Sequence, residues 1–197
     1  MNVRLAIPTD ARQLALLHRE CGGPVGDSLV EKLGTSFLRA YYAVMLLEAS
    51  TVIICATDAK GVIVGFCSGS VNAARHRRNM RRHRWRLALG SVPAVLRRPS
   101  ILFSAKKRAA AAGAEYAEGE CHSFFWAWRE KSPPVGGAIL LFKKWLAIVR
   151  TLGAKDVHID VRKDNAKVVA IHRALGAAPL PSAEGESALE WRMVYRG

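Results

Sequence analysis

The sequence predicts a single α/β domain in which helices flank a central mixed, mostly antiparallel sheet. Three observations lead to this prediction. An alternating segment, Val3–Ile7, is followed at once by a helix start. Two β-branched runs, Thr51–Thr57 and Val62–Val71, are separated by one short turn. An extended aromatic stretch leads through a glycine turn into a long helix, expected at about 136–152. Because 197 residues suffice for one compact domain but not for two of ordinary size, we expect residues 1–197 to form one domain.

The first elements expected along the chain are a strand, two helices and a hairpin. Asp10 follows the strand and Gln13 lies three residues later, which is the spacing of a capping box, so Asp10 is expected to be the N-cap of the first helix. The turn Asp58–Gly61 joins the two β-branched runs and indicates an antiparallel hairpin. The second helix is expected where apolar residues recur at helical intervals, at Phe37, Tyr41, Val44 and Leu47.

The second half of the chain alternates between strands and helices. Gly153 is expected to end the long helix. Apolar and polar residues alternate over Val157–Val161, which predicts a strand, and a helix is expected over Asn165–Leu175. A last strand or hairpin is expected over Ala177–Leu180 and Leu189–Tyr195.

Positive charge is concentrated in one segment. Residues Arg75–Arg108 contain ten Arg and two Lys but no Asp or Glu. Without this segment the chain carries 18 basic and 16 acidic residues, a net charge of +2 instead of +14. The segment is expected to form one or two helices, interrupted at Pro93 and Pro99, within a basic helical insertion between strands at 75–112. A partial apolar face of this insertion consists of Trp85, Ala88, Leu89, Val92, Val95 and Leu96.

Three interpretations of the basic insertion stay open. A solvated charged face is the simplest, but like charges without acidic partners repel each other, so an anionic partner is favoured. Anionic lipid fits because Trp85, Leu87, Leu89 and Leu96 accompany the arginines, whereas nucleic acid fits less well because no recognised binding motif is present. The third interpretation is an anionic acceptor whose phosphates the arginines bind. We favour a membrane surface or a phosphorylated acceptor.

Several classes of protein are not indicated. The four cysteines, Cys21, Cys55, Cys67 and Cys121, form no CxxC pair, so we expect small buried hydrophobic residues rather than metal ligands or a disulfide framework. The longest candidate membrane span, Leu87–Leu96, has ten residues, where a membrane helix needs about 20. No secretion signal is recognised at the N-terminus, so we expect a cytoplasmic protein, with peripheral attachment at the inner membrane face as an option.

The order of these elements resembles the GNAT acetyltransferase superfamily. The matching segments are Val3–Asp10 at the start, Val62–Phe66 in the hairpin, Gly136–Ala138 at the glycine turn and Asp164–Gly176 near the end. The resemblance covers most of the chain apart from the basic insertion. It implies a GNAT-like domain that transfers an acetyl group from acetyl-coenzyme A to a primary amine, directly within a ternary complex and without a metal.

Residues expected to hold the pyrophosphate of the cofactor lie at the glycine turn. A glycine turn before a helix leaves several backbone N–H groups without an intrahelical partner, which suits a pyrophosphate. One position of the family's pattern falls on Pro133, which has no N–H to donate. Nearby positive charge is expected from Arg129 and Lys131. The expected donors are the amides of Val135, Gly136, Gly137, Ala138 and Ile139.

Two further cofactor contacts are implied by the resemblance. The strand backbone at Trp126, Ala127 and Trp128 is expected to bind the thioester carbonyl and the pantetheine amides. Asn165 is expected to contact the cofactor arm. The alternatives are that the tryptophans fill the core and that Asn165 is a helix cap.

The resemblance assigns catalytic roles to positions that hold histidine in this chain. The position of the general base falls on His122, and Glu120 is the alternative base because it lies two residues earlier on the same face. The position of the general acid, commonly a tyrosine, falls on His172. Imidazole suits both roles near neutral pH. The alternatives are a strand histidine bonded to a carbonyl for His122, and a satisfied interior histidine for His172 with a water or Glu118 as the acid.

The acceptor is expected to be a small-molecule amine. Family members whose second helix resembles Leu33–Tyr42, and which carry a basic stretch after the hairpin, are associated with surface-polysaccharide assembly, so the resemblance implies an amino sugar. The competing hypothesis is a GNAT-like binding protein without efficient turnover that docks on anionic lipid or nucleic acid through Arg75–Arg108. A homodimer is left open.

Overall fold

The computed structural model describes residues 2–22, 32–101, 116–129, 132, 134–162, 164–180 and 190–197. Its strands are β1 (Asn2–Leu5), β2 (Thr51–Thr57), β3 (Ile63–Ser70), β4 (Cys121–Trp128), β5 (Val157–Arg162), β6 (Ala178–Pro179) and β7 (Glu190–Tyr195). Its helices are the short 3-10 helix η1 (Pro8–Asp10) and the α-helices α1 (Ala11–Cys21), α3 (Gly34–Met45), α4 (Ala73–Arg82), α5 (Arg84–Arg97), α7 (Gly137–Thr151) and α8 (Ala166–Ala174).

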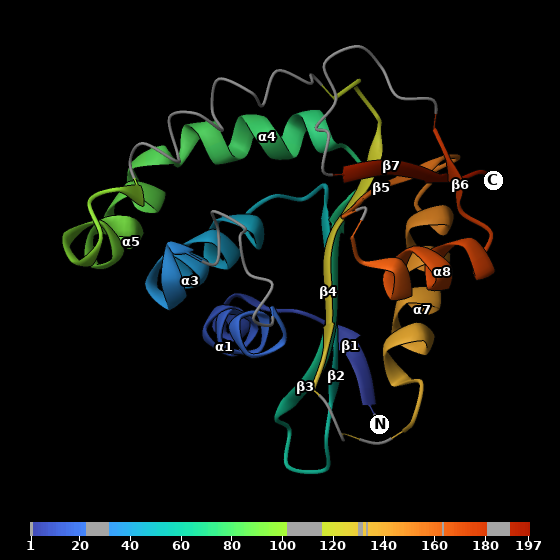
Figure 1. The fold of residues 1–197 in the computed structure, drawn as a ribbon, viewed down its shortest axis with the longest axis horizontal. Coiled ribbons are helices and arrows are strands. Elements are labelled where there is room, and N and C mark those ends of the chain that lie inside the picture. Colours follow the sequence, from blue (N-terminus) through green and yellow to red (C-terminus); the bar gives the residue numbers. More distant parts are fainter. Residues whose placement is uncertain are drawn as a thin grey trace.

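These strands form one sheet in the order β1-β2-β3-β4-β5-β7-β6. Every pair of neighbouring strands is antiparallel except β4 and β5, which run parallel. Helices α1 and α3 lie on one side of the sheet, and α7 and α8 lie on the other (Figure 1). The mixed, mostly antiparallel sheet with flanking helices confirms the predicted fold class.

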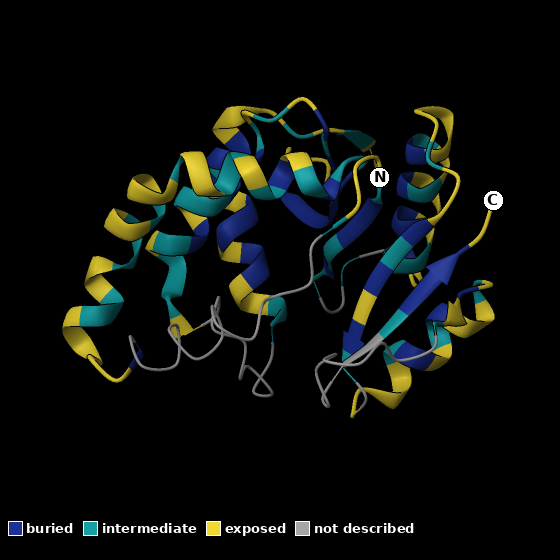
Figure 2. Ribbon diagram, turned by 90° about the horizontal axis from the view of Figure 1, so that it is seen from above, coloured by how far each residue is buried: buried dark blue, intermediate teal, exposed yellow. Residues whose placement is uncertain are grey.

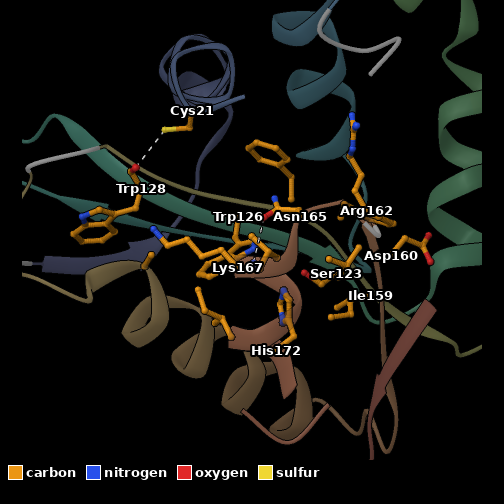
Figure 3. A pocket seen from close by; sticks show the side chains of 16 residues that line it. Cys21, Ser123, Trp126, Trp128, Ile159, Asp160, Arg162, Asn165, Lys167 and His172 are labelled. Carbon is orange, nitrogen blue, oxygen red and sulfur yellow. Dashed lines mark hydrogen bonds between the residues drawn. The ribbon is translucent and has the colours of Figure 1, made fainter. Parts of the chain in front are cut away.

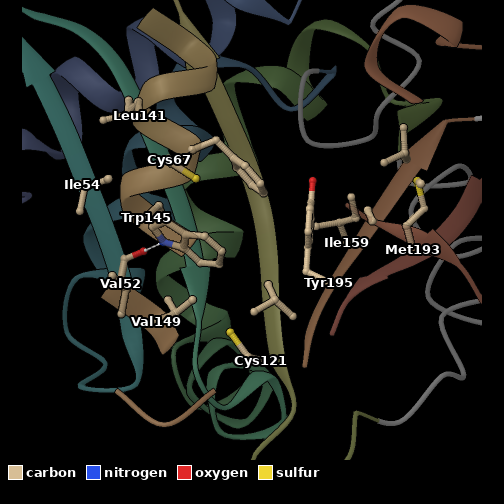
Figure 4. Packing of buried hydrophobic residues seen from close by; sticks show 14 of the residues in the cluster. Val52, Ile54, Cys67, Cys121, Leu141, Trp145, Val149, Ile159, Met193 and Tyr195 are labelled. Atoms are coloured by element: carbon tan, nitrogen blue, oxygen red, sulfur yellow. Dashed lines mark hydrogen bonds between the residues drawn. The ribbon is translucent and has the colours of Figure 1, made fainter. Parts of the chain in front are cut away.

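Two apolar cores lie on opposite faces of the sheet. On the α7 and α8 face, the fully buried Trp145 packs among strand residues and donates from Nε1 to the carbonyl of Val52 at 2.9 Å (Figure 4). On the other face, Leu14 of α1 and Tyr42 of α3 pack with Phe66 of β3. Because both faces of β2 and β3 are covered, these strands appear in the sequence as nearly continuous apolar runs.

The start of α1 differs from the prediction. Asp10 makes no side-chain cap on α1; its carboxylate accepts from the Ile7 N–H at 2.8 Å and from the two terminal nitrogens of Arg4 at 2.6 and 2.9 Å. The hydrogen bond from Arg4 lowers the pKa of Asp10, although burial opposes the shift. Gln13 accepts from the N–H of Ile63 at 3.0 Å instead of completing a capping box. Asp10 is therefore the N-cap residue of α1, as predicted, but its side chain does not cap the helix, because Arg4 of β1 competes for the carboxylate.

The basic segment forms two helices, α4 and α5, which lie beside α3 on the α1 side of the sheet (Figure 1). Asn72 caps α4 by accepting from the N–H of Arg75 at 2.9 Å. The break between the helices falls at His83, and Pro93 lies inside α5, so the predicted interruption at Pro93 is wrong. Gly90 allows close packing on α3, since a Cβ there would lie 3.0 Å from the Cβ of Ala40. The predicted end of the insertion, 102–112, lies outside the described residues.

A β-bulge interrupts β4. Ser68 of β3 lies opposite Phe125 and Gly69 lies opposite Ser123, so Phe124 is the extra residue. Phe124 and Phe125 consequently both pack on the α1 and α3 side, and Trp126 packs on the α7 side. The bulge therefore determines on which side of the sheet each of these aromatic residues of β4 packs.

Replacing Gly69 by alanine is expected to destabilise the protein by roughly 2–3 kcal/mol, the range for overpacking a filled core. A Cβ at Gly69 would lie 2.2 Å from Cζ2 of the buried Trp145 and 2.5 Å from the carbonyl oxygen of His122. Chemical denaturation measures the loss. The matched variant is Gly61→Ala in the hairpin turn, where nothing lies within 4 Å and the φ of 76° is the one penalty, so about 1 kcal/mol is expected. Equal losses for the two variants would contradict the predicted clash.

Candidate functional site

A cleft opens where the two parallel strands part. β4 and β5 are paired only at Cys121 with Val157, His122 with His158, and Ser123 with Ile159. Beyond these pairs lies a cleft of about 550 Å³ (Figure 3). Its walls are β4 from Ser123 to Trp128, β5 from Ile159 to Arg162, and α8 with the residue that precedes it, and it also touches Cys21 and Ala138.

The β4 wall carries backbone groups that are available to a ligand. Beyond Ser123, the edge of β4 that faces β5 has no strand partner in the part of the chain that the structure describes. Trp126 and Trp128 line the cleft as well as packing against the α7 core, so both interpretations of these tryptophans hold for their side chains. The side chain of Ala127 packs in the α1 and α3 core, which leaves its backbone as the part able to contact a ligand.

The glycine turn has the expected conformation. Gly136 is the N-cap of α7 with a φ of 78°, a left-handed value that favours glycine. The N–H of Gly137 donates to the carbonyl of Pro134 at 2.9 Å, so this predicted donor is already used within the turn. The amides of Val135, Ala138 and Ile139 have no acceptor among the described residues, and Ala138 lines the cleft. Pro133 lies outside the described residues.

The positive charge near the cleft differs from the prediction. Arg129 bonds to both carboxylate oxygens of Glu20, with Nε 2.9 Å from Oε1, so its charge is already compensated and it does not line the cleft. Lys131 lies outside the described residues. Lys167, at the start of α8, lines the cleft instead. The sequence carried a signal for it, because the first turn of a helix that begins beside a strand end lies at the mouth of a cleft.

Asn165 has both of the functions considered for it. Its side chain accepts from the N–H of Val168 at 3.2 Å, which caps α8. It also lines the cleft (Figure 3). The cap and a ligand contact are compatible because an amide side chain has donors that the cap leaves free.

His122 lies at the paired end of the cleft, within a cluster of charged groups. Its Nε2 is 3.3 Å from Oδ2 of Asp160, and its Nδ1 is 3.8 Å from Oε1 of Glu120. Burial opposes the charged imidazole, but the nearby carboxylates of Asp160 and Glu120 outweigh it and raise the pKa of His122. Only Asp160 is within hydrogen-bond distance, and Nδ1 of His122 has no hydrogen-bond partner among the described residues. Glu120 lies immediately before β4, with its carboxylate beside His122. His122 is 2 % exposed and does not line the cleft, whereas Asp160 does.

Asp160 was missed as a site residue. It connects His122 to the cleft, and its other oxygen lies 3.3 Å from Nε of Arg192 on β7. Burial opposes ionisation, but His122 and Arg192 keep the pKa of Asp160 below its usual value. The alternation over Val157–Val161 placed Asp160 on the polar face, but only the pairing of β4 with β5 shows that this face meets His122.

Comparison with known proteins shows which solved structures share this fold. No protein-family model and no curated protein matches the sequence. Among solved structures, the chain is similar to the PaiA N-acetyltransferase of Thermoplasma acidophilum in complex with coenzyme A, at 10% identity and a TM-score of 0.62 over 100% of both chains. It is similar to the ribosomal-protein-S18-alanine N-acetyltransferase of Escherichia coli, at 11% identity and a TM-score of 0.60 over 99% of this chain and 92% of that chain.

A third similar structure names the superfamily. It is a GNAT superfamily phosphinothricin acetyltransferase from Sinorhizobium meliloti in complex with AcCoA, at 12% identity and a TM-score of 0.59 over 99% of this chain and 87% of that chain. The chain has a GNAT fold. The predicted resemblance is thus confirmed for the fold, and these similarities do not extend to a link with surface-polysaccharide assembly.

His172 lies on the wall of the cleft of this GNAT fold. Its Nδ1 is 2.5 Å from the hydroxyl of Tyr195 on β7, and it is 2 % exposed. Burial lowers the pKa of His172 to about 4, so the imidazole is neutral at pH 7. A charged imidazolium, which the predicted acid role requires, is therefore disfavoured. Tyr195 was missed because its approach to His172 depends on the order of strands in the sheet, which the sequence pattern does not reveal.

Three consecutive aromatic residues of β4 each lie beside a buried histidine from a helix, and Phe124 also lies 5.5 Å from the buried His122 of its own strand. The ring of His76 is 4.4 Å from that of Phe124, His18 is 3.6 Å from Phe125, and His172 is 5.6 Å from Trp126, measured between centroids. The three histidines come from different helices, α4, α1 and α8. They fix the central strand of the GNAT fold from both of its faces.

These buried histidines predict a loss of stability in mild acid. Burial lowers the pKa of His18, His76 and His172 to about 4, from 6.5 in the unfolded chain. Between these pH values the unfolded chain binds more protons, so stability is present above pH 6.5 and is lost as pH falls toward 4. At pH 5 the expected loss is roughly 1–2 kcal/mol per histidine, measured by chemical denaturation at pH 7 and pH 5. The raised pKa of His122 acts in the opposite direction, at higher pH.

A pair of variants assigns this pH dependence. His172→Gln is expected to reduce the loss of stability between pH 7 and pH 5, because one of the three groups no longer titrates. His83→Gln, between α4 and α5, is the matched control and is expected to retain the full loss. An unchanged pH dependence in the His172 variant would show that its burial does not control acid stability.

Proposed function

We propose that this protein is an acetyl-coenzyme A-dependent N-acetyltransferase that acetylates a primary amine. The observation that supports the proposal is the cleft between β4 and β5. It has an unpaired helix amide, that of Ala138, on one wall and the carboxylate of Asp160 on another. The GNAT fold adds support by analogy, since two of the similar structures contain coenzyme A or its acetyl thioester.

The residues of the cleft fit a thioester carrier with a pyrophosphate. The amides of Val135, Ala138 and Ile139 are free to donate to phosphate oxygens, at the positive end of α7. The edge of β4 at Trp126 and Ala127 that faces away from β3 is suited to bind the pantetheine amides in the manner of an added strand. The carbonyl of Trp128 already accepts from the thiol of Cys21 at 3.4 Å. Asn165 and Lys167 lie on the opposite wall. When bound, acetyl-coenzyme A supplies an activated acetyl group.

His122 is proposed as the general base. A primary ammonium must lose a proton before it can attack, and a base with a pKa near the working pH is most effective. The carboxylates of Asp160 and Glu120 raise the pKa of His122 above its usual value, which makes its imidazole a stronger base than that of a free histidine. Asp160 is the group that meets the cleft, so we assign it the position next to the amine and the transfer of the proton to His122. The carboxylate of Glu120 lies 3.8 Å from the other ring nitrogen, Nδ1, and adds a negative charge beside the imidazole.

His172 is proposed to assist the departure of the thiolate as a neutral donor. Its Nδ1 is engaged with Tyr195, so Nε2 is the ring nitrogen left for a ligand. A hydroxyl that donates to Nδ1 places the ring proton on Nε2, from which a hydrogen bond to a thiolate is possible. In this assignment Tyr195 is a positioning residue that sets the tautomer.

Calorimetry with acetyl-coenzyme A tests the proposal. Binding at micromolar to millimolar concentration is expected, and no detectable heat at millimolar cofactor would leave the transferase without support and favour a binding protein. A thiol-release screen over amino sugars, polyamines and peptide amines then identifies the acceptor. We propose an amino sugar as the acceptor, and release that is specific for peptide amines would overturn that choice without affecting the acetyl transfer itself.

A further inference from the structure

The outward face of α5 carries a stripe of exposed apolar side chains. Trp85, Leu89, Val92 and Leu96 are spaced by four, three and four residues, so they lie on one face of the helix. Their exposed fractions are 72%, 72%, 45% and 77%. We call these four residues the α5 stripe. No residue of α5 is buried, and the ribbon of this helix in Figure 2 is yellow and teal.

The α5 stripe is not the face that packs on the rest of the protein. Gly90 lies against Phe37 and Ala40 of α3, and in helical position it is well removed from the stripe. The stripe therefore remains open to solvent after α5 has docked on α3. Such an outward row of exposed apolar side chains marks an interaction surface.

Arginines without acidic partners surround the stripe. Arg75 pairs with Glu48 and Arg78 pairs with Glu118, so the few acidic residues near α4 are already used. Six further arginines are exposed and have no acidic partner among the described residues: Arg81, Arg82, Arg84, Arg86, Arg97 and Arg98. There is no Asp or Glu in the sequence from Ala73 to Ile101.

We propose that α5 docks on an anionic lipid surface, with the α5 stripe inserted at the boundary between headgroups and acyl chains. Apolar side chains on one face with flanking arginines are the features that hold a helix in the plane of a membrane interface. The arginines of α5, which flank the α5 stripe, then contact lipid phosphates. The association is peripheral: none of the helices that the structure describes is long and apolar enough to cross a bilayer. The proposal does not depend on acetyl transfer.

Charge selects this partner over two others. A second copy of the chain would place Arg84, Arg86 and Arg97 opposite arginines of the same sign, with no acidic residue in either α5 to compensate. A nucleic acid would satisfy the arginines through its phosphates but would leave Leu89 and Leu96 exposed to water. An anionic bilayer satisfies both the charge and the apolar stripe.

Vesicle co-sedimentation with the full chain at low salt tests the proposal. Binding is expected to vesicles that contain phosphatidylglycerol, and much less to vesicles of phosphatidylcholine alone. Leu89→Ser with Leu96→Ser is expected to lower the partition coefficient by about tenfold or more. The matched control is Leu47→Ser with Leu152→Ser, which changes two leucines that are 55% and 59% exposed outside α5, and it is expected to bind normally.

Charge and depth are tested separately. Arg84→Gln with Arg86→Gln is expected to weaken binding by roughly 25-fold, about fivefold per charge, whereas Arg12→Gln with Lys60→Gln is expected to leave binding within about threefold. Anionic vesicles are expected to shift the tryptophan fluorescence to the blue, and Trp85→Phe to remove that shift. Normal thermal melting of each variant shows that it folds.

Four outcomes would overturn the proposal. The first is no binding to phosphatidylglycerol vesicles at low salt. The second is binding that both leucine pairs leave unchanged. The third is tighter binding to a random DNA duplex that the α5 leucine variant retains, which would identify nucleic acid as the partner. A concentration-dependent dimer that is lost in the Leu89 and Leu96 variant, without vesicle binding, would identify a second copy instead.

Discussion

His122→Ala is expected to lower kcat for acetyl transfer by about 100-fold to 1,000-fold, the contribution of a positioned general base. The affinity for acetyl-coenzyme A should change by less than about threefold, because His122 does not line the cleft. Asp160 remains ionised beside Arg192 in the variant and loses the partner that takes up the proton. The rate of the variant should rise with pH, since free amine then becomes available without a base. Steady-state kinetics between pH 6 and pH 9, with the amine found by thiol release, measures both effects.

Two controls separate chemistry from folding. His122 is buried, so thermal melting must show that the variant is folded. His83→Ala removes a histidine outside the cleft and is expected to leave kcat unchanged. A His122 variant that turns over at the normal rate, with the normal pH profile, would remove this residue from the mechanism and leave Asp160 and Glu120 to be tested in the same way.

Gly137→Ala is expected to weaken acetyl-coenzyme A binding by about 100-fold, the loss of one or two hydrogen bonds to a charged group. A Cβ at Gly137 would lie 2.2 Å from Cζ2 of Trp128 and within 2.6 Å of two further ring atoms. Trp128 is held by a hydrogen bond from Nε1 to the carbonyl of Ser132 at 3.0 Å, so the start of α7 has to move instead. That movement displaces the free amide of Ala138 from the cleft. Calorimetry measures the change in affinity.

The matched control for this variant lies at the other end of the same helix. Gly153→Ala introduces a Cβ with nothing within 4 Å, although its φ of 96° costs some stability. It should bind acetyl-coenzyme A normally. Normal binding by the Gly137 variant would show that the start of α7 does not hold the pyrophosphate.

The sequence predicted elements whose signal is local. The hairpin, the alternating strand β5 and the helix that begins at the glycine turn all follow from residues within one element, and the structure confirms them. The continuous helix through Pro93 was not predicted because packing of α5 on α3 outweighs the local preference of proline. The bulge at Phe124 was not predicted either, because a bulge is a property of two strands, and the sequence of one strand does not record its register.

The site residues divide in the same way. His122 and His172 were predicted from their positions relative to the glycine turn and Asn165, and each lies at the cleft or next to one of its walls. The role of Asp160 depends on β5 pairing with β4, and that of Tyr195 on β7 pairing with β5. Pairing between distant strands leaves little trace in a single sequence. The amides at the start of α7 were predicted as free donors. That of Gly137 is not free, because it donates to the carbonyl of Pro134, and this bond depends on the conformation of the turn.

Three residue pairs between β4 and β5 join two parts of the sheet, an N-terminal part of strands β1 to β4 and a C-terminal part of β5, β7 and β6. A molecule bound beyond these pairs would bridge β4 and β5, in place of the backbone hydrogen bonds that the diverging strands lack. A ligand in the cleft should therefore raise the free energy of unfolding of the C-terminal part of the sheet by RT ln(1 + [L]/Kd). Amide protons of β5 and β7 should then exchange more slowly as the ligand concentration rises. Ligand binding in the cleft and the stability of the C-terminal strands are therefore linked by the same free energy.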